Sequence, residues 1–475
     1  MSEQHMAPQD GRPQGQTALD PDALDPEVRD PEARVRRGRL IARLAMGGAA
    51  VLILAMIAGV SFFFVPKGVP AGAASDLPSN GLEVWSRAGE RGGLGAAWME
   101  LNDAMAAGDR EAFLAFADGD EAKESLARWW DGTKAIGWDL GYALPSARYE
   151  ESTGSTIDQI TLGAQLAFSA HADRGSGLSS AGLKLTQSFN YDVSYSVNDG
   201  DTLKISAVTP TADSRMPWDD GEVYAAKRDH VVLFGLASEK ALIDGTVEEA
   251  EAAAKLALDK TKQMGGDPPL DGFVAAITDS EDAFSRWYGP DQVVFDVAGI
   301  ATQTLKPAST AMEIDPEIAV GEGNSGMIVT MSPKSADDRT AVFVHEFAHV
   351  IHETAAPDEQ AFVIGHSQKV EGFARFFENY AGVGNGYFGD PRTAQNILNL
   401  GEGALSDDIF NSEDAHLFYS AAGSYYQFVA DTGGDPWKVA LGWNSDQSLL
   451  QLGTARGAQF DLAHWQEWVR QQAGG

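Results

Sequence analysis

The sequence contains no cysteine, and this absence excludes several kinds of site at once. Without a thiol the chain can form no disulfide, no thiolate metal site, no iron–sulfur cluster and no cysteine nucleophile. Basic residues are scarce too, with 35 Lys and Arg against 69 Asp and Glu, so the formal net charge is −34. A field of that sign repels phosphate backbones and argues against nucleic-acid binding. Any metal site must therefore use His, Asp and Glu.

Long apolar runs are also missing, apart from one over residues 44–65 that carries no charged residue. As a helix it would span about 33 Å, enough to cross a bilayer. Five arginines lie shortly before it, whereas Lys67 is the one basic residue between the run and Arg87. The positive-inside bias predicts a cytoplasmic tail over 1–43 and an exported remainder. The alternative is a cleavable signal peptide, but the run is longer than a usual signal core. A single-pass cell-membrane protein is therefore expected.

The chain is long enough for two or three domains. After a linker over 66–90, apolar residues first follow a helical spacing. They then alternate strictly with polar residues over 189–197, which predicts a half-buried strand before a turn at 198–201. Helices followed by an antiparallel sheet predict an α+β module over 91–213. The order of elements resembles the cone-shaped fold of nuclear-transport-factor-like domains.

The remainder, residues 214–475, begins with short apolar runs and continues with helical patterns. The runs at 231–235, 273–277 and 327–331 predict buried strands, and the Glu- and Ala-rich run 246–264 predicts a helix. After Asp337 the pattern is helical almost to the end of the chain. The sequence therefore predicts a second α+β domain with a mostly helical C-terminal half.

A possible metal site lies at the start of this helical half, where the sequence is His345-Glu346-x-x-His349. Residues four apart lie one turn along the same face of a helix, so both imidazoles can reach one ion. Glu346 lies beside that ion, positioned to take a proton from a water that the metal activates. A catalytic zinc site needs a third protein ligand and an open position.

The third ligand is expected to be Glu371, which a second helix would bring back to the two histidines. The sequence Glu371-Gly372-Phe373-Ala374 follows His349 by 22 residues. With the His345-Glu346-x-x-His349 motif it resembles the gluzincin metallopeptidases, and most closely the peptidase-MA-like and aminopeptidase-N-like branch. The resemblance implies one Zn²⁺ per chain, held by His345, His349 and Glu371, with Glu346 as general base.

Other His and Glu residues lie near the motif. His366 lies in a connector and could replace Glu371, whereas His352 is about 10 Å along the helix from His345 and too far to share the ion. Glu353 and Glu378 are expected to be solvated carboxylates. Thermolysin-like relatives have an Asp four residues after the ligand Glu, where this chain has Arg375, so the support of the ligands differs.

A donor for the transition state is expected on a later helix. Aminopeptidase-N-like enzymes use a Tyr there, within a Tyr-x-x-Gly context, and this chain has Tyr419 four residues before Gly423. Tyr425 and Tyr426 are alternatives, and all three could instead be aromatic core residues.

The expected fold class is α+β: a transmembrane helix, a small cone-like module, and a gluzincin-type metallopeptidase domain over 214–475. The expected function is a membrane-anchored, extracytoplasmic zinc peptidase acting on peptides or proteins, its oligomeric state left open. The strand at 326–331 is expected to pair with an extended substrate. It lacks the amine-binding Glu of aminopeptidases, and Glu322 is a poor substitute, which favours an endopeptidase. The alternatives are an aminopeptidase, or a membrane-tethered binding or scaffold protein that retains the fold.

Overall fold

The computed structural model describes residues 100–473. Its gaps are at 102, 106, 138–140, 151–153, 166–185, 198–202, 212–214, 268–269, 289–297, 304–326, 356–366 and 443–446. The described residues lie in one compact unit, which begins at Pro78. The predicted boundary between 213 and 214 falls inside this unit.

The membrane prediction is corrected. In the part of the chain that the structure describes, no helix is both long enough and apolar enough to cross a bilayer. The longest, α8 (Lys240–Gln263), has sufficient length, but charged residues such as Lys255 and Asp259 lie along its exposed face. The tail, the apolar run 44–65 and the linker lie outside the described residues. The expected single transmembrane helix is thus not found, and the single-pass membrane location inferred from it is not supported.

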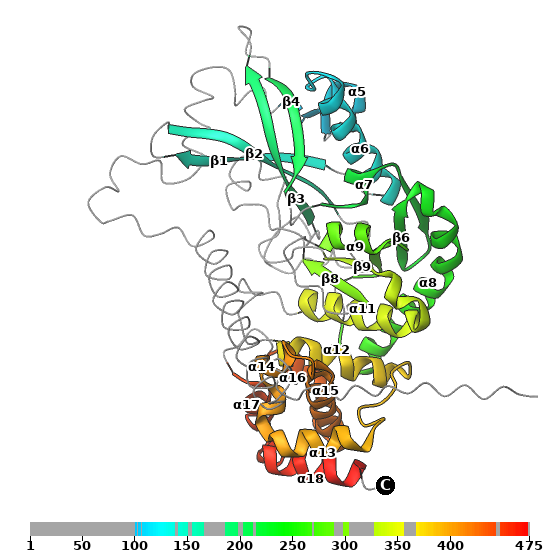
Figure 1. The fold of residues 1–475 in the computed structure, drawn as a ribbon, viewed down its shortest axis with the longest axis vertical. Helices are drawn as coiled ribbons and strands as arrows, with labels where there is room; N and C mark the ends of the chain where they lie inside the picture. Colours follow the sequence, from blue (N-terminus) through cyan, green and yellow to red (C-terminus); the bar gives the residue numbers. More distant parts are fainter. Residues whose placement is uncertain are drawn as a thin grey trace, which may run out of the picture. The chain divides into compact units, whose positions relative to one another are not determined.

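The N-terminal part contains helices and an antiparallel sheet (Figure 1). Its helices include α5 (Arg110–Leu114) and α6 (Asp120–Ile136). The strands, paired in the order β1-β2-β3-β4, are β1 (Gly141–Glu150), β2 (Gly154–Gln165), β3 (Thr186–Val197) and β4 (Leu203–Pro210). The predicted strand at 189–197 is confirmed within β3. Its alternating Phe189, Tyr191 and Val193 are buried in one core with Trp129 and Trp130 of α6.

A second sheet has five strands in the order β5-β6-β7-β9-β8. The three inner strands are parallel, and the two outer strands, β5 and β8, each run antiparallel to their neighbour. The strands are β5 (Val223–Lys227), β6 (Val231–Leu236), β7 (Phe273–Ile277), β8 (Gly299–Gln303) and β9 (Met327–Met331). The predicted strands at 231–235, 273–277 and 327–331 are confirmed as the parallel centre.

Both faces of the inner strands are buried, each in a different core. In β7, Phe273, Ala275 and Ile277 face the core shared with α8, whereas Val274 and Ala276 face the core shared with α6. Such continuous apolar strands are typical of sheets covered on both sides. The shorter helices α7 (Pro217–Asp220) and α9 (Glu281–Tyr288) also contact this sheet. The two sheets therefore share a core through α6.

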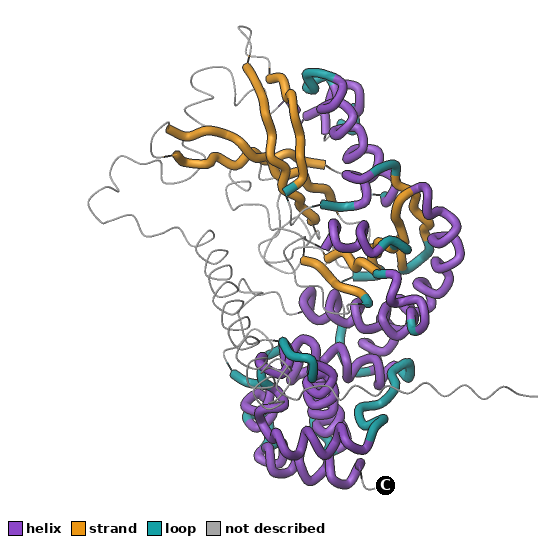
Figure 2. Tube along the Cα trace, viewed as in Figure 1, coloured by secondary structure: helices purple, strands orange, loops and turns teal. Residues whose placement is uncertain are grey.

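After β9 the described chain is helical (Figure 2). The helices are α11 (Arg339–Ala355), α12 (Ser367–Ala381), α13 (Pro391–Leu400), α14 (Asp407–Phe410), α15 (Ala415–Asp431), α16 (Pro436–Ala440), α17 (Leu449–Thr454) and α18 (Leu462–Ala473). Helix α11 packs against α8, β8 and α12, and α12 packs against α15. The expected fold class is corrected accordingly: helices predominate around a small mixed sheet, and no membrane-spanning helix is among them.

The contact between α12 and α15 is close because α12 carries a glycine there. A Cβ added at Gly372 would lie 2.8 Å from the Cβ of Ala422, nearer than side chains pack. Phe373, Phe376 and Phe377 of α12 are fully buried around this contact. The contact with α15 fixes the position of α12 and thereby determines which of its side chains face α11.

Candidate metal centre

Helix α11 is held in place by an apolar stripe that leaves its other face for polar side chains. Phe343, Phe347 and Ile351, spaced four residues apart, are fully buried, as their helical spacing predicts. Phe347 stacks on Phe273 of the central strand β7, with ring centroids 4.0 Å apart. This packing turns His345 and His349 away from the sheet core and toward α12.

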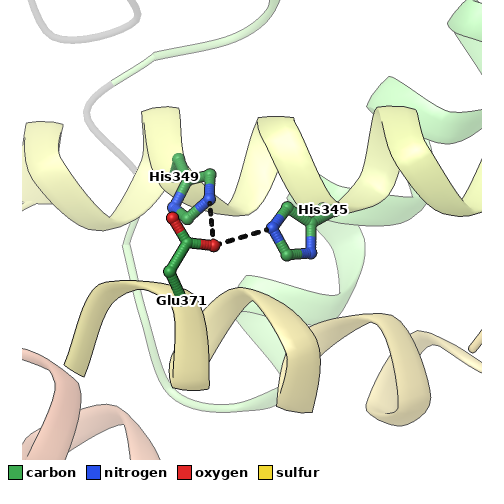
Figure 3. A group of neighbouring side chains, drawn as sticks. All are labelled: His345, His349 and Glu371. Carbon is green, nitrogen blue, oxygen red and sulfur yellow. Dashed lines mark hydrogen bonds and ion pairs between the residues drawn. The ribbon is translucent and has the colours of Figure 1, made fainter. Parts of the chain in front are cut away.

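Helix α12 presents Glu371 to both imidazoles (Figure 3). One carboxylate oxygen, Oε2, lies 3.2 Å from Nε2 of His345 and 3.4 Å from Nε2 of His349. The three side chains form a cluster whose potential ligand atoms all lie within 4.8 Å of one another. The structure thus brings together the three residues that the sequence singled out. His366, the alternative third ligand, lies outside the described residues.

The spacing of these atoms fits a tetrahedral metal ion. Zinc lies about 2.0–2.2 Å from nitrogen and oxygen ligands, so two tetrahedral ligands are about 3.3 Å apart. The two distances to Oε2 of Glu371, 3.2 and 3.4 Å, match that separation, and the two imidazole nitrogens lie within 4.8 Å of each other. Two imidazoles and a carboxylate are also the donor set of a catalytic zinc site, which keeps its fourth position open. The residues present therefore fit Zn²⁺.

The charges of the cluster stabilise one another. Burial lowers the pKa of His345, but the carboxylates of Glu371 and Glu378 outweigh it, so the net pKa is well above the usual value. The pKa of His349 is raised in the same way, mainly by Glu371. Burial acts to raise the pKa of Glu371, but the two imidazoles hold it well below its ordinary range. A cation entering the cluster would take the place of protons on the imidazoles.

Glu346 lies on α11 between the two histidines in sequence and is 5% exposed. Burial raises the pKa of its carboxyl group, an effect that the neighbouring imidazoles reduce. Strand β8 passes beside it, and the backbone N–H of Ala301 donates a hydrogen bond to its carboxylate. A Cβ at Gly299 of β8 would lie 3.2 Å from Oε1 of Glu346, so the glycine allows this approach. Glu346 is thus held beside the cluster at the edge of the sheet.

Glu378 was expected to be a solvated carboxylate, and this prediction is wrong. Its side chain is 7% exposed, and Oε1 lies 2.5 Å from Nδ1 of His345. With Nδ1 donating to Glu378, Nε2 of His345 is free to act as a metal ligand. Glu378 lies seven residues after Glu371, two turns on and on the same face of α12. That i, i+7 spacing was the signal in the sequence that could have identified it.

The three candidate tyrosines of α15 have different surroundings. Tyr425 and Tyr426 are fully buried, and their hydroxyl groups donate to the carbonyl oxygens of Phe460 and Lys369. Both are therefore core residues. Tyr419 is partly exposed, and its ring centroid lies 6.3 Å from that of His345. Tyr419 is the one of the three that lies beside the cluster.

His352 belongs to the core rather than to the cluster. It is fully buried, and its Nε2 donates to the carbonyl oxygen of Ala440 at 2.7 Å. Burial lowers the pKa of His352 to about 4, so the ring is neutral at ordinary pH. The sequence argument that excluded it as a ligand is consistent with this position.

The strand expected to pair with substrate is not at an edge. Strand β9 is hydrogen-bonded to β7 on one side and to β8 on the other, so its backbone groups are already paired. Among the described strands, β8 forms the edge of the sheet next to α11. The sequence did not single out residues 299–303, because a five-residue strand with two polar positions gives little signal.

A scan against models of known protein families finds none that matches this chain, and a search of curated proteins finds no similar sequence. The likeness to gluzincins therefore rests on the motif residues around His345 and Glu371. The geometry of the cluster is the basis on which a function can be proposed.

Proposed function

We propose that this chain is a zinc-dependent peptidase that hydrolyses peptide bonds at the His345–His349–Glu371 cluster. The observation that carries the proposal is the separation of the three ligand atoms, 3.2 and 3.4 Å along two edges, which matches a tetrahedral zinc site. A buried carboxylate, Glu346, stands next to the cluster, as hydrolysis by an activated water requires.

The residues divide the work of hydrolysis. Zn²⁺ in the cluster would polarise the peptide carbonyl and make a water molecule nucleophilic near neutral pH. Glu346 takes the proton of the attacking water and passes it to the departing amine. Its raised pKa suits a group that must both accept and release a proton. Tyr419, beside His345, is the residue that would donate a hydrogen bond to the oxyanion.

The position of β8 at the edge of the sheet favours an extended peptide as the substrate. An edge strand offers backbone N–H and C=O groups to a chain that adds itself to the sheet. Because β8 contacts α11 and Ala301 touches Glu346, a peptide along β8 would bring its backbone to the base. The proposed role of β8 is therefore the one that the sequence had suggested for residues 326–331.

The alternative, a binding or scaffold protein that retains this fold, makes a different prediction about Glu346. A scaffold has no use for a general base beside a metal cluster, whereas hydrolysis by an activated water requires one. Chelation separates the two functions. A peptidase loses hydrolysis of a peptide library when the metal is removed and regains it when zinc is returned, whereas a scaffold hydrolyses nothing in either state.

Cleavage is expected to be internal. In peptides of one sequence with a free or an acetylated N-terminus, the same internal bond should be cut at rates within about twofold of each other. The reason is that β8, the strand proposed to bind the peptide, reads Gly-Ile-Ala-Thr-Gln and has no carboxylate for an ammonium group, and its neighbour β9 has none either. Glu322 lies outside the described residues. Mass spectrometry of the products identifies the cleaved bond. Stepwise release of single N-terminal residues, prevented by acetylation, would show that the enzyme is an aminopeptidase.

A further inference from the structure

Glu378 does not act on His345 alone, because its second oxygen is also held. While Oε1 faces Nδ1 of His345, Oε2 accepts a hydrogen bond from Nη1 of Arg375, one turn earlier on α12. The Glu378 side chain is 7% exposed and that of Arg375 is 22% exposed. A buried carboxylate with both oxygens occupied cannot rotate away from the imidazole without losing a charged partner.

Arg375 is in turn fixed by the loop that follows α12. Its Nη2 donates to the carbonyl oxygen of Gly386 at 2.9 Å. The N–H of Gly386 donates to Oδ1 of Asn379 at 2.8 Å, and Nδ2 of Asn379 donates to the carbonyl oxygen of Arg375 at 2.9 Å. Gly386 has a φ of 76°, a conformation that a side chain would strain. The loop thus forms a closed set of hydrogen bonds around the guanidinium group.

Helix α15 leaves space for this arrangement. A Cβ at Gly423 would lie 2.8 Å from Cγ of Arg375 and 2.9 Å from Cε1 of Tyr387. Both distances are shorter than atoms in a packed interior tolerate. The absence of a side chain at Gly423 therefore lets Arg375 extend toward Glu378. This explains the glycine without reference to its spacing from Tyr419.

We propose that Arg375 and Glu378 act as one positioning pair that keeps Nε2 of His345 aimed at the metal, and that metal affinity depends on both. This inference rests on the proposed zinc site and names the support of one of its ligands. It also gives a role to the arginine that stands where thermolysin-like relatives have an acidic residue. In this chain the carboxylate is that of Glu378, three residues after Arg375. Arg375 binds the oxygen of Glu378 that does not contact His345.

The first test measures the zinc affinity of the metal-free full chain by competition with a chromophoric chelator. Arg375→Met keeps an unbranched apolar stem and removes the charge. By releasing Glu378 it should weaken zinc binding about 10- to 100-fold, the loss that is usual when the hydrogen-bond partner of a ligand is lost. The zinc affinity of Arg375→Lys should lie between those of the wild type and Arg375→Met. Its single ammonium group keeps the charge but cannot donate to both Glu378 and Gly386 as the guanidinium group does. Arg392→Met is the control, since Arg392 is 86% exposed and pairs with Asp390 at the surface.

The second test asks whether the two residues act together. Glu378→Gln should weaken zinc binding to a similar extent, and the double variant Arg375→Met/Glu378→Gln should be no weaker than the worse single variant. A merely structural role for Arg375 would give effects that multiply. Thermal unfolding of the metal-free proteins shows whether each variant folds. If Arg375→Met does not fold, Arg375→Lys and Glu378→Gln decide the result.

The inference fails if the folded Arg375 and Glu378 variants bind zinc within twofold of the wild type, or if their effects multiply. The proposed zinc site itself would then still stand, provided that the wild type binds zinc and Glu371→Ala does not. If the wild-type chain binds no zinc, the proposed function fails as well. The two failures are therefore distinguishable in one set of titrations.

Discussion

Replacing Glu346 by glutamine should abolish peptide hydrolysis and leave zinc binding intact. The amide retains the size of the side chain but cannot take a proton, and a general base contributes about 100- to 10,000-fold to the rate. The ligand atoms of His345, His349 and Glu371 are untouched, so the variant should still bind one zinc per chain. The measurement combines peptide cleavage with metal analysis of the same sample.

A matched control is Glu402→Gln, the same substitution at an exposed position of the helical half. Its cleavage rate should equal that of the wild type, which also shows that a copurifying protease is not responsible for the activity. Turnover of Glu346→Gln at the wild-type rate would contradict the assignment of Glu346 as the base. Loss of zinc from this variant would instead mean that Glu346 helps to hold the ion.

Replacing Glu371 by alanine should remove zinc from the purified protein. Two imidazoles remain, but the anionic ligand, which also stabilises the charged histidines, is lost. The loss of affinity should exceed the about 10- to 100-fold expected for a residue that only supports a ligand. Equilibrium dialysis against zinc with elemental analysis measures it. Glu371→Asp keeps the negative charge but shortens the side chain by one methylene group. Its zinc affinity should lie between those of Glu371→Ala and the wild type.

Unchanged zinc binding in Glu371→Ala would move the third ligand elsewhere, and His366 is then the residue to replace next. A wild-type affinity would also be difficult to reconcile with the geometry, since Oε2 of Glu371 is the atom that both imidazoles face.

The metal ligands could be predicted from the sequence because local geometry decides most of their positions. The i, i+4 spacing of His345 and His349 places both imidazoles on one face of any helix that contains them. The spacing of Phe343 and Phe347 shows which face is buried. Glu371 required one further step, a second helix that returns to the first, and the resemblance to a known motif supplied it.

The sequence could place Glu378 on the face of α12 that carries Glu371, but it could not show which residue contacts His345, because that depends on how two helices face each other. Arg375 and Glu378 are both within two turns of Glu371, and periodicity alone does not tell which one reaches His345. The answer follows from the rotation of α12, which the contact of Gly372 with Ala422 of α15 fixes. Contacts between helices distant in sequence decide such details.

The sheet shows the same limit. Apolar runs predicted the central strands β6, β7 and β9, because strands buried on both faces have few polar residues. They did not predict the strand order or the antiparallel edge strand β8, which is short and carries two polar residues. The strand that the sequence suggested for substrate binding, β9, lies inside the sheet and not at its edge. The membrane prediction depended on one apolar run that lies outside the described residues, and none of the described helices is long and apolar enough to span a bilayer.

The central claim, a zinc-dependent peptidase, is tested most directly by titrating Zn²⁺ into the metal-free full chain while following cleavage of an internally quenched peptide. Hydrolysis should be absent without metal, rise in proportion to added zinc and reach its plateau at one equivalent per chain. Glu346→Gln should show no hydrolysis at any zinc concentration. Zinc that binds at one equivalent without any hydrolysis, or hydrolysis that is indifferent to the metal, would contradict it.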